Sequence, residues 1–178
     1  MRTPMIPLTL LSLVLIGCTD DVPTAPSSGG SGAAARAAAN GKALPFHGTL
    51  KAATHTSLYD PETNTVLIHL VGTGTANHLG RFTLVSDLVL DPATLTGPEQ
   101  MTLTAANGDM LFATGTGQGI PSADGLTLSS VESMTITGGT GRFAGATGSF
   151  ILRQVNLGTD LISSGSFTGT IALGKRHH

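Results

Sequence analysis

Short segments of alternating or β-branched apolar residues, separated by turn residues, constrain the fold of this chain more than any other feature. About eight such segments follow residue 45, and none of them has a sustained helical period. Asn107-Gly108, between two of the segments, is the dipeptide most typical of a tight β-hairpin. The pattern predicts an all-β domain with strands near residues 46–53, 65–75, 82–90, 101–105, 110–117, 126–137, 149–156 and 166–173.

The number of predicted strands favours a closed sheet. Eight antiparallel strands in one small domain close most naturally into a β-barrel, which removes exposed sheet edges and leaves a narrow interior. A two-sheet β-sandwich is the alternative arrangement. The predicted domain, residues 45–174, has an ordinary size for a single core.

The beginning of the chain carries a lipobox. Leu15-Ile16-Gly17-Cys18 closes an apolar run that follows Arg2, and Cys18 is the only cysteine in the chain. The run is shorter than the roughly 20 residues that cross a bilayer, which favours a signal peptide over a membrane span. Residues 1–17 are therefore predicted to be a lipoprotein signal peptide, with Cys18 as the lipid acceptor. An ordinary signal peptide cleaved elsewhere is the alternative.

These features predict where the protein works. We expect it to be exported and lipid-anchored to the bacterial cell envelope, on the periplasmic or the cell-surface side, with a membrane as its partner through the lipid. Residues 18–44 are predicted to be the lipidated cysteine and a flexible tether, because residues 19–43 are rich in Pro, Gly, Ser and Ala and lack large apolar side chains. Residues 175–178 are interpreted as a tail.

Charge and composition exclude several partners. The formal net charge of −2 becomes −3 when Arg2 leaves with the signal peptide, so the chain offers no basic surface for nucleic acid. Aromatic residues make up 4% of the chain and tryptophan is absent, which leaves few platforms for stacking sugars or bases. We expect no nucleic-acid partner and no cofactor.

Glu132 and His69 are the candidate catalytic residues. On the strand predicted at 126–137, a period of two places Glu132 on the same face as Leu128, Met134 and Ile136. If that face lines the barrel, burial should raise the pKa of the carboxyl and make it a general acid or base. A shifted register, or a place at the rim beside an arginine, is the alternative. His69 lies inside an apolar run as an interior partner, a titrating switch or a ligand-facing group.

Four more polar residues are candidates for binding a ligand. His78 and Arg81 flank a glycine where a loop enters a strand, and they would suit an anionic group at a barrel mouth. Gln154 and Asn156 share a strand face with apolar residues and would give the interior neutral polar partners. No second histidine or carboxylate stands at metal-ligand spacing from His69, so we expect no metal site.

Two segments carry a resemblance to a known family. TGGTGRFAGATGSF at residues 137–150 and NHLGRFT at residues 77–83 resemble connections in bacterial allene-oxide-cyclase-like barrels, a group whose architecture dirigent proteins and spirotetronate cyclases share. The resemblance implies an eight-stranded barrel with an apolar pocket, often assembled as a homo-dimer or homo-trimer. The polar residues that work in allene oxide cyclase have no positional match here, so the resemblance implies architecture and not catalysis.

The glycine-dense segment has its own physical interpretation. Gly139, Gly141, Gly145 and Gly148 permit positive φ and close backbone approach at a sharp corner, and Phe143 is placed to plug one barrel end. A phosphate-binding loop would need a following helix and a lysine, and neither is present.

Three functions are compatible with these features. The barrel binds a small apolar ligand, or it has a structural role through oligomer contacts, or it is a cyclase or isomerase-type enzyme acting on a flexible hydrophobic substrate. No G-x-S-x-G sequence is present and the single cysteine is assigned to the lipid, which disfavours acyl transfer. The sequence favours binding or structure over catalysis.

Overall fold

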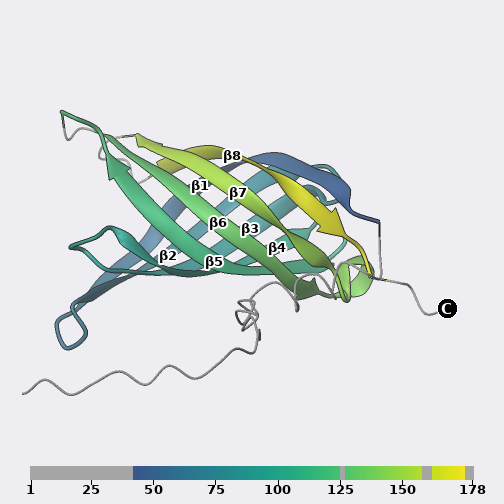
Figure 1. Cartoon of the computed structure of the whole chain (residues 1–178), viewed down its shortest axis with the longest axis horizontal. Coiled ribbons are helices and arrows are strands. Elements are labelled where there is room, and N and C mark those ends of the chain that lie inside the picture. Colours follow the sequence, from purple (N-terminus) through teal and green to yellow (C-terminus); the bar gives the residue numbers. More distant parts are fainter. Residues whose placement is uncertain (1–41, 125–126, 158–161, 175–178) are drawn as a thin grey trace, which may run out of the picture. The chain divides into compact units, whose positions relative to one another are not determined.

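The computed structural model describes residues 42–124, 127–157 and 162–174. Eight strands form one closed antiparallel barrel, in which each strand pairs with its neighbours in the chain and the last pairs with the first (Figure 1). The predicted all-β barrel is therefore confirmed, and the two-sheet sandwich is not the fold. The strands are β1 (Leu44–Asp60), β2 (Thr65–Ala76), β3 (Gly80–Leu90), β4 (Thr96–Ala105), β5 (Met110–Pro121), β6 (Thr127–Gly139), β7 (Thr147–Leu157) and β8 (Ile162–Ala172).

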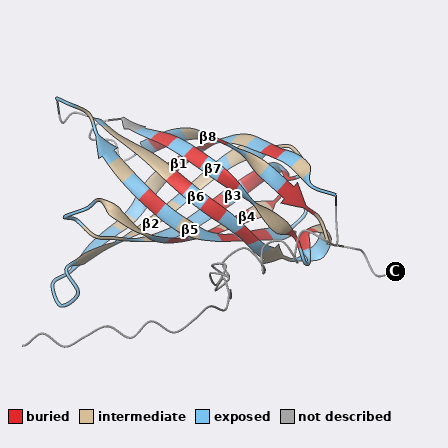
Figure 2. Cartoon of the chain, viewed as in Figure 1, coloured by how far each residue is buried: buried red, intermediate tan, exposed pale blue. Residues whose placement is uncertain are grey.

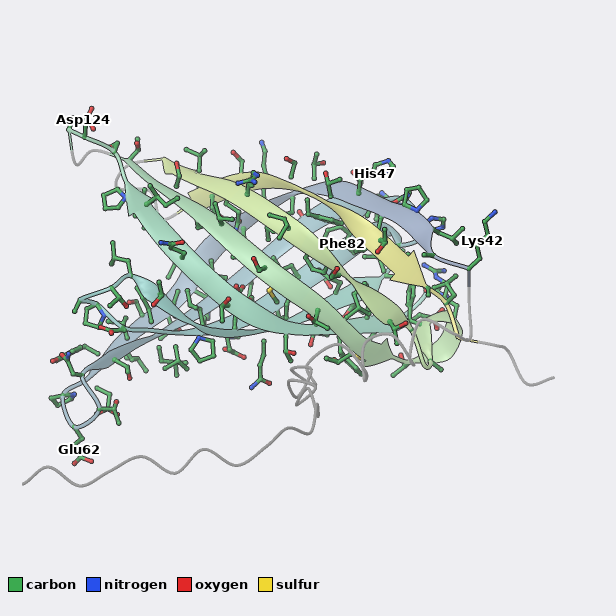
Figure 3. All side chains as sticks on the ribbon, in the orientation of Figure 1. Lys42, His47, Glu62, Phe82 and Asp124 are labelled. Carbon is green, nitrogen blue, oxygen red and sulfur yellow. The ribbon has the colours of Figure 1, made fainter. Side chains whose placement is uncertain are left out.

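One face of every strand points into the barrel, where apolar side chains are packed against one another. Phe46, Phe82, Phe150 and Phe167 form the centre of this core, with neighbouring ring centroids 5.0–6.4 Å apart. Figure 3 shows the Phe82 ring within the barrel. Offset and edge-on ring contacts of this kind add stability beyond the burial of apolar area, so the aromatic cluster anchors this half of the barrel.

The end of the barrel next to this cluster, here called the plugged end, is covered by the glycine-dense connection. The 3-10 turn η2 (Gly141–Phe143) follows β6, and the Phe143 side chain is fully buried (Figure 1). Gly141, Gly145 and Gly148 have positive φ, as the sequence predicts. Gly139 does not, and it is needed for close approach, because a Cβ there would overlap the carbonyl oxygen of Met110.

The opposite end, here called the hairpin end, carries the turns that join β1 to β2, β3 to β4 and β5 to β6 (Figure 1). Burial falls toward this end (Figure 2). On β6, the inward-facing residues Ile136, Met134 and Glu132 are buried, whereas Ser130 and Leu128 are half-buried. The interior is thus tightly packed at the plugged end and reached by solvent at the hairpin end.

The lipobox, Cys18 and most of the predicted tether lie outside the described residues, as does the predicted tail. Among the residues that the structure describes, no helix has the length and apolar character to span a membrane.

Candidate functional site

Glu132 faces the barrel interior, as the alternation on its strand predicts. Its side chain is only 5% exposed, and its Oε1 accepts hydrogen bonds from Ser130 Oγ at 2.9 Å and from Gln154 Nε2 at 2.7 Å. Ser163 Oγ in turn donates to Gln154 Oε1 at 2.9 Å, which fixes the orientation of the amide. The carboxyl is therefore held from β6, β7 and β8 together, and it does not lie at the barrel rim beside an arginine.

A second buried carboxyl belongs to Glu99 on β4, which the sequence analysis missed. It is 4% exposed, and Ser86 Oγ on β3 donates a hydrogen bond to its Oε1. Met101 and Leu103 alternate along the same strand, and one further step of two residues from Met101 reaches Glu99. That extended alternation is the signal by which the residue could have been found.

Glycines on the intervening strand make room for the two carboxyls. Gly115, Gly117 and Gly119 occupy successive inward-facing positions of β5, between β4 and β6. A Cβ built on Gly117 would lie 3.4 Å from Glu99 Oε2 and 3.5 Å from Glu132 Cγ. The two glutamates thus converge over a stretch of β5 whose inward-facing positions carry no side chains.

Burial changes the titration of both groups. Removal from water, and then the neighbouring Glu132 carboxyl, raise the pKa of Glu99 to about 8 against the lowering effect of its hydrogen bond from Ser86. Removal from water also raises the pKa of Glu132, opposed by its hydrogen bonds from Gln154 and Ser130. Low dielectric surroundings disfavour the charged form of a carboxyl, so Glu99 is largely protonated at neutral pH.

Each carboxyl keeps one oxygen without a partner. Glu99 Oε2 and Glu132 Oε2 are both buried and have no hydrogen-bond partner among the described residues. A buried polar atom left unpaired costs roughly 1–3 kcal/mol, and more when it is charged. Such a pair of atoms is uncommon in a packed interior and calls for a functional explanation.

Apolar side chains surround the carboxyl pair on the side of the hairpin end. Leu88 Cδ1 lies 3.4 Å from the Cβ position of Gly117, and Leu128 Cδ1 and Leu95 Cβ each lie 3.4 Å from that of Gly119. All three leucines are half-buried. The carboxyl pair is thus bounded by the packed core on one side and by solvent-accessible apolar side chains on the other.

Two of the predicted ligand-binding residues, Gln154 and Asn156, lie on β7. Gln154 belongs to the site, because its Nε2 donates a hydrogen bond to Glu132. Asn156 lies on β7, in register with Leu128 on one side and Ser163 on the other, but its side chain lies outside the described residues.

His69 is not brought together with Glu132. It lies half-exposed on the outer wall of the barrel, where its Nδ1 is 2.7 Å from Asp87 Oδ1. Its ring centroid is 6.0 Å from that of His55, which is also outside. The inward-facing residues of β2 are Ile68 and Leu70 on either side of it, so His69 does not face the interior.

His78 and Arg81 lie at the plugged end, on the far side of the core from the carboxyl pair. His78 is exposed, has a φ of 60° and places its Nε2 3.1 Å from the Pro45 carbonyl oxygen. Arg81 is also exposed. Together they line a groove of about 500 Å³ with Arg142, which donates to the Leu79 carbonyl oxygen at 2.9 Å.

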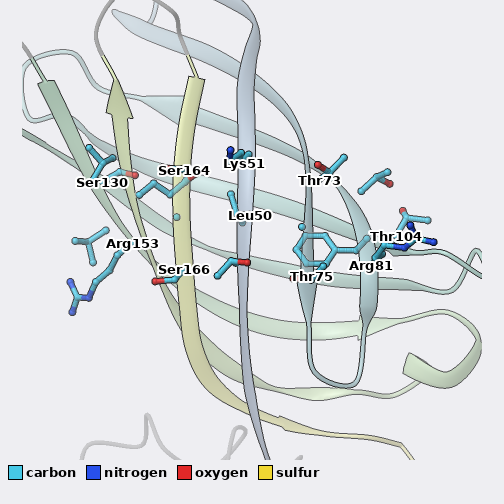
Figure 4. A pocket seen from close by; sticks show the side chains of 18 of the residues that line it. Leu50, Lys51, Thr73, Thr75, Arg81, Thr104, Ser130, Arg153, Ser164 and Ser166 are labelled. Carbon is cyan, nitrogen blue, oxygen red and sulfur yellow. The ribbon is translucent and has the colours of Figure 1, made fainter.

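A hollow of about 1400 Å³ is lined from several strands (Figure 4). Its lining combines exposed outward-facing side chains, such as Lys51, Thr73 and Arg81, with inward-facing Leu50 and Gln154. Neither Glu99 nor Glu132 is among the described residues that line it. The two carboxyls therefore do not line this hollow, whereas Ser130 and Gln154, which donate hydrogen bonds to Glu132, do.

Comparison with known proteins supports the fold. No protein-family model matches the chain, and no curated protein sequence matches it. Among solved structures, it is similar to the pterocarpan synthase dirigent protein GePTS1, with a TM-score of 0.55 and 13% identity, over 78% of this chain and 90% of that chain. The barrel is dirigent-like. An identity this low shows the fold alone.

No three His, Cys, Asp or Glu side chains within residues 42–124, 127–157 and 162–174 are grouped so that they could hold a metal ion. The chemistry that the described site offers is that of two buried carboxyls, one amide and two hydroxyls.

Proposed function

We propose that this barrel binds a small, largely apolar molecule at its hairpin end, with the carboxyl pair contacting the polar group of that molecule. The observation that carries the proposal is the pair of buried, unpartnered oxygens, Glu99 Oε2 and Glu132 Oε2, on two side chains that both approach Gly117. Ligand sites are mostly apolar with a few placed polar groups, and this end of the barrel has that composition.

The half-burial of the leucines near the pair supports the same proposal. Leu88 and Leu128 face inward, yet solvent reaches them, whereas Leu84, Met134 and Ile136, which face inward nearer the plugged end, are buried. Apolar area that stays accessible inside a barrel gains roughly 25 cal/mol per Å² when a ligand covers it. A ligand body packed there would complete the core that the chain leaves unfinished.

Binding of a neutral fluorescent probe tests this function. N-phenyl-1-naphthylamine should bind the full chain saturably, with enhanced emission, at one site per barrel. Leu128→Glu, which puts a charge in the apolar lining, should weaken binding about ten-fold or more, equivalent to about 1.4 kcal/mol. Ile151→Glu is the matched control, because Ile151 is 39% exposed on the outer wall. Equal effects of the two variants, or the absence of saturable binding, would contradict the proposal.

A second candidate function is acid–base catalysis by a cyclase or isomerase-type enzyme. The raised pKa of Glu99, about 8, favours it, because a carboxyl protonated at neutral pH can donate a proton to a bound substrate. The solved neighbour is named a synthase, which is consistent with this candidate. Turnover of a cyclisation substrate found by screening should fall by about 10²–10⁴ in Glu132→Gln and Glu99→Gln. Unchanged turnover in both variants would leave binding as the function.

We also propose that the barrel is held at the bacterial cell envelope by a lipid on Cys18. The lipobox and the absence of any other cysteine support this proposal. Two or more acyl chains anchor a protein stably, since each buried CH₂ contributes about 0.8 kcal/mol. The natural chain should fractionate with membranes and carry the added mass of the lipid on Cys18, and Cys18→Ser should lose both. Membrane association that survives the substitution would contradict the anchor.

A further inference from the structure

The hydrogen bonds around the carboxyl pair leave acceptors in excess. Ser86 Oγ, Ser130 Oγ and Gln154 Nε2 each donate to an Oε1 atom, and so they are already engaged. When both carboxyls are ionised, what remains free at the pair is one acceptor on each glutamate, Oε2, with both side chains more than nine-tenths buried. A ligand group that suits the ionised pair must bring donors and no further acceptors.

The protein supplies no positive charge to the pair from the described residues. The exposed lysines and arginines of the described residues are Lys42, Lys51, Arg81 and Arg153. His69 contacts Asp87 outside, and Arg142 contacts Leu79 at the plugged end. The exposed histidines of the described residues are His47, His55 and His78. Among described groups, the nearest charge partner of each buried carboxyl is therefore the other carboxyl.

An organic ammonium matches these requirements better than the alternatives. A primary ammonium has three N–H donors, no acceptor and a positive charge, whereas an alcohol brings one donor and two more acceptors. Hydrogen bonds between ammonium and carboxylate are roughly twice as strong as neutral ones. A calcium ion would need six to eight oxygen ligands, and this site offers two free ones.

We propose that the ligand is a primary amine with an apolar body, whose ammonium lies between Glu99 Oε2 and Glu132 Oε2 above Gly117 and whose body packs on Leu88 and Leu128. This inference rests on the proposed binding function and names the ligand class of that site. Binding replaces a proton of the carboxyl pair with the ammonium, so the pair changes from a protonated to an ionised form and a proton leaves to solvent. The apolar body is what distinguishes this ligand from an inorganic cation.

A matched pair of competitors tests the ligand class. Nonylamine and nonan-1-ol have the same chain and differ only in the polar group. With N-phenyl-1-naphthylamine bound to the full chain at pH 7, nonylamine should displace the probe at a concentration roughly ten-fold lower than nonan-1-ol. Glu99→Gln and Glu132→Gln should each bring the two competitors within about three-fold of each other. Glu62→Gln is the control carboxyl, because Glu62 is exposed at the tip of the β1–β2 hairpin (Figure 3).

A measurement without variants gives an independent outcome. Calorimetric titration of the natural chain with nonylamine, in two buffers of different protonation enthalpy, should show net proton release at pH 7. Release of no proton, or equal displacement by nonylamine and nonan-1-ol, would overturn the amine and leave the binding function standing. A ratio unchanged by both glutamine variants would overturn the placement at the carboxyl pair. If neither the probe nor either competitor binds, the proposed function fails, and this inference fails with it.

Discussion

Glu99 on β4 and Glu132 on β6 converge over Gly117 of the strand between them, with Glu99 Oε2 at 3.4 Å and Glu132 Cγ at 3.5 Å from the position of a Cβ on that glycine. Two acidic groups this near each other in a buried place cannot both ionise without cost. Ionisation of both carboxyls together is therefore unfavourable, and the two groups lie at the boundary between the packed core and the half-buried apolar end of the barrel.

The carboxyl pair should make the barrel less stable as the pH rises. The folded chain holds a proton on Glu99 with a pKa of about 8, and the unfolded chain releases it near the ordinary value of 4.5. The contribution of Glu99 to the free energy of unfolding is thus fully present below about pH 4.5 and is lost as the pH rises through about 8. Its size is on the order of a few kcal/mol.

Urea unfolding of the natural chain and of Glu99→Gln at pH 5, 7 and 9 measures this effect. The difference between the two proteins is the quantity of interest, because every other ionisable group is common to both. Glu99→Gln should gain stability relative to the natural chain as the pH rises. A difference that stays constant from pH 5 to pH 9 would show that Glu99 titrates as it does in the unfolded chain.

Two glycines of β5 should differ strongly in how much an added methyl group destabilises the barrel. Gly117→Ala places its Cβ in ordinary van der Waals contact with Leu88 and the two glutamates, so the barrel should fold with a change in stability below about 1 kcal/mol. Gly115→Ala would overlap the carbonyl oxygen of Ser133, so it should destabilise by several kcal/mol or prevent folding. Thermal unfolding of both variants checks this, and similar melting temperatures would contradict the described packing. Gly117→Ala should also weaken probe binding, because it fills the gap between the carboxyls.

Neighbouring residues of β7 test the inside and outside of the barrel. Phe150 is buried in the aromatic cluster, so Phe150→Ala should cost about 3–5 kcal/mol of unfolding free energy. Ile151, the next residue, is 39% exposed on the outer wall, and Ile151→Ala should cost about 1 kcal/mol or less. Denaturant titration of the two variants gives the comparison. Equal losses would mean that the alternation of this strand is not the one described.

Removal of His69 should leave ligand binding unchanged. Its pair with Asp87 lies half-exposed on the outer wall, away from the interior, and exposed ion pairs are worth about 0–1 kcal/mol. His69→Ala should therefore bind N-phenyl-1-naphthylamine as the natural chain does and unfold at nearly the same denaturant concentration. Loss of probe binding in His69→Ala, with the fold intact, would move the site to the outer wall.

The strands could be predicted from the sequence because their physical signals are local. Alternation at Met101 and Leu103, and the Asn107-Gly108 turn, act through neighbours in the chain, and the structure has a strand and a turn at those places. The inward face of Glu132 could be predicted in the same way, from Leu128, Met134 and Ile136 at alternate positions of the same strand. The observed strands begin or end a few residues beyond the predicted limits, mainly in β1, β4 and β8.

Glu99, the second carboxyl of the site, does not follow from the alternation of apolar residues in this segment. Gly97 and Pro98 interrupt that alternation before Met101, so the predicted strand begins at residue 101 and excludes Glu99. The pairing of β4 with β3 ends at Glu99, so Pro98, which has no backbone N–H, lies beyond that ladder. The convergence of Glu99 with Glu132 depends on strand order and on the register with β5, which a local pattern does not carry.

His69 illustrates a different limit. Both faces of β2 are apolar around it, with Ile68 and Leu70 inward and Leu67 and Val71 outward. A strand that is apolar on both faces gives no alternation from which to choose the buried side. The pairing of His69 with the exposed Asp87 on the neighbouring strand β3 shows that His69 faces outward, and that pairing exists only in the folded barrel.

Carbon-13 NMR titration of the glutamate side-chain carboxyls, assigned with Glu99→Gln and Glu132→Gln, tests the central claim most directly. We predict that Glu99 titrates near pH 8 and Glu132 above its usual range, and that both signals shift when N-phenyl-1-naphthylamine is added while that of Glu62 does not. Titration of Glu99 and Glu132 near the ordinary value of 4.5, with no response to the probe, would show that the carboxyl pair is neither buried nor part of a binding site.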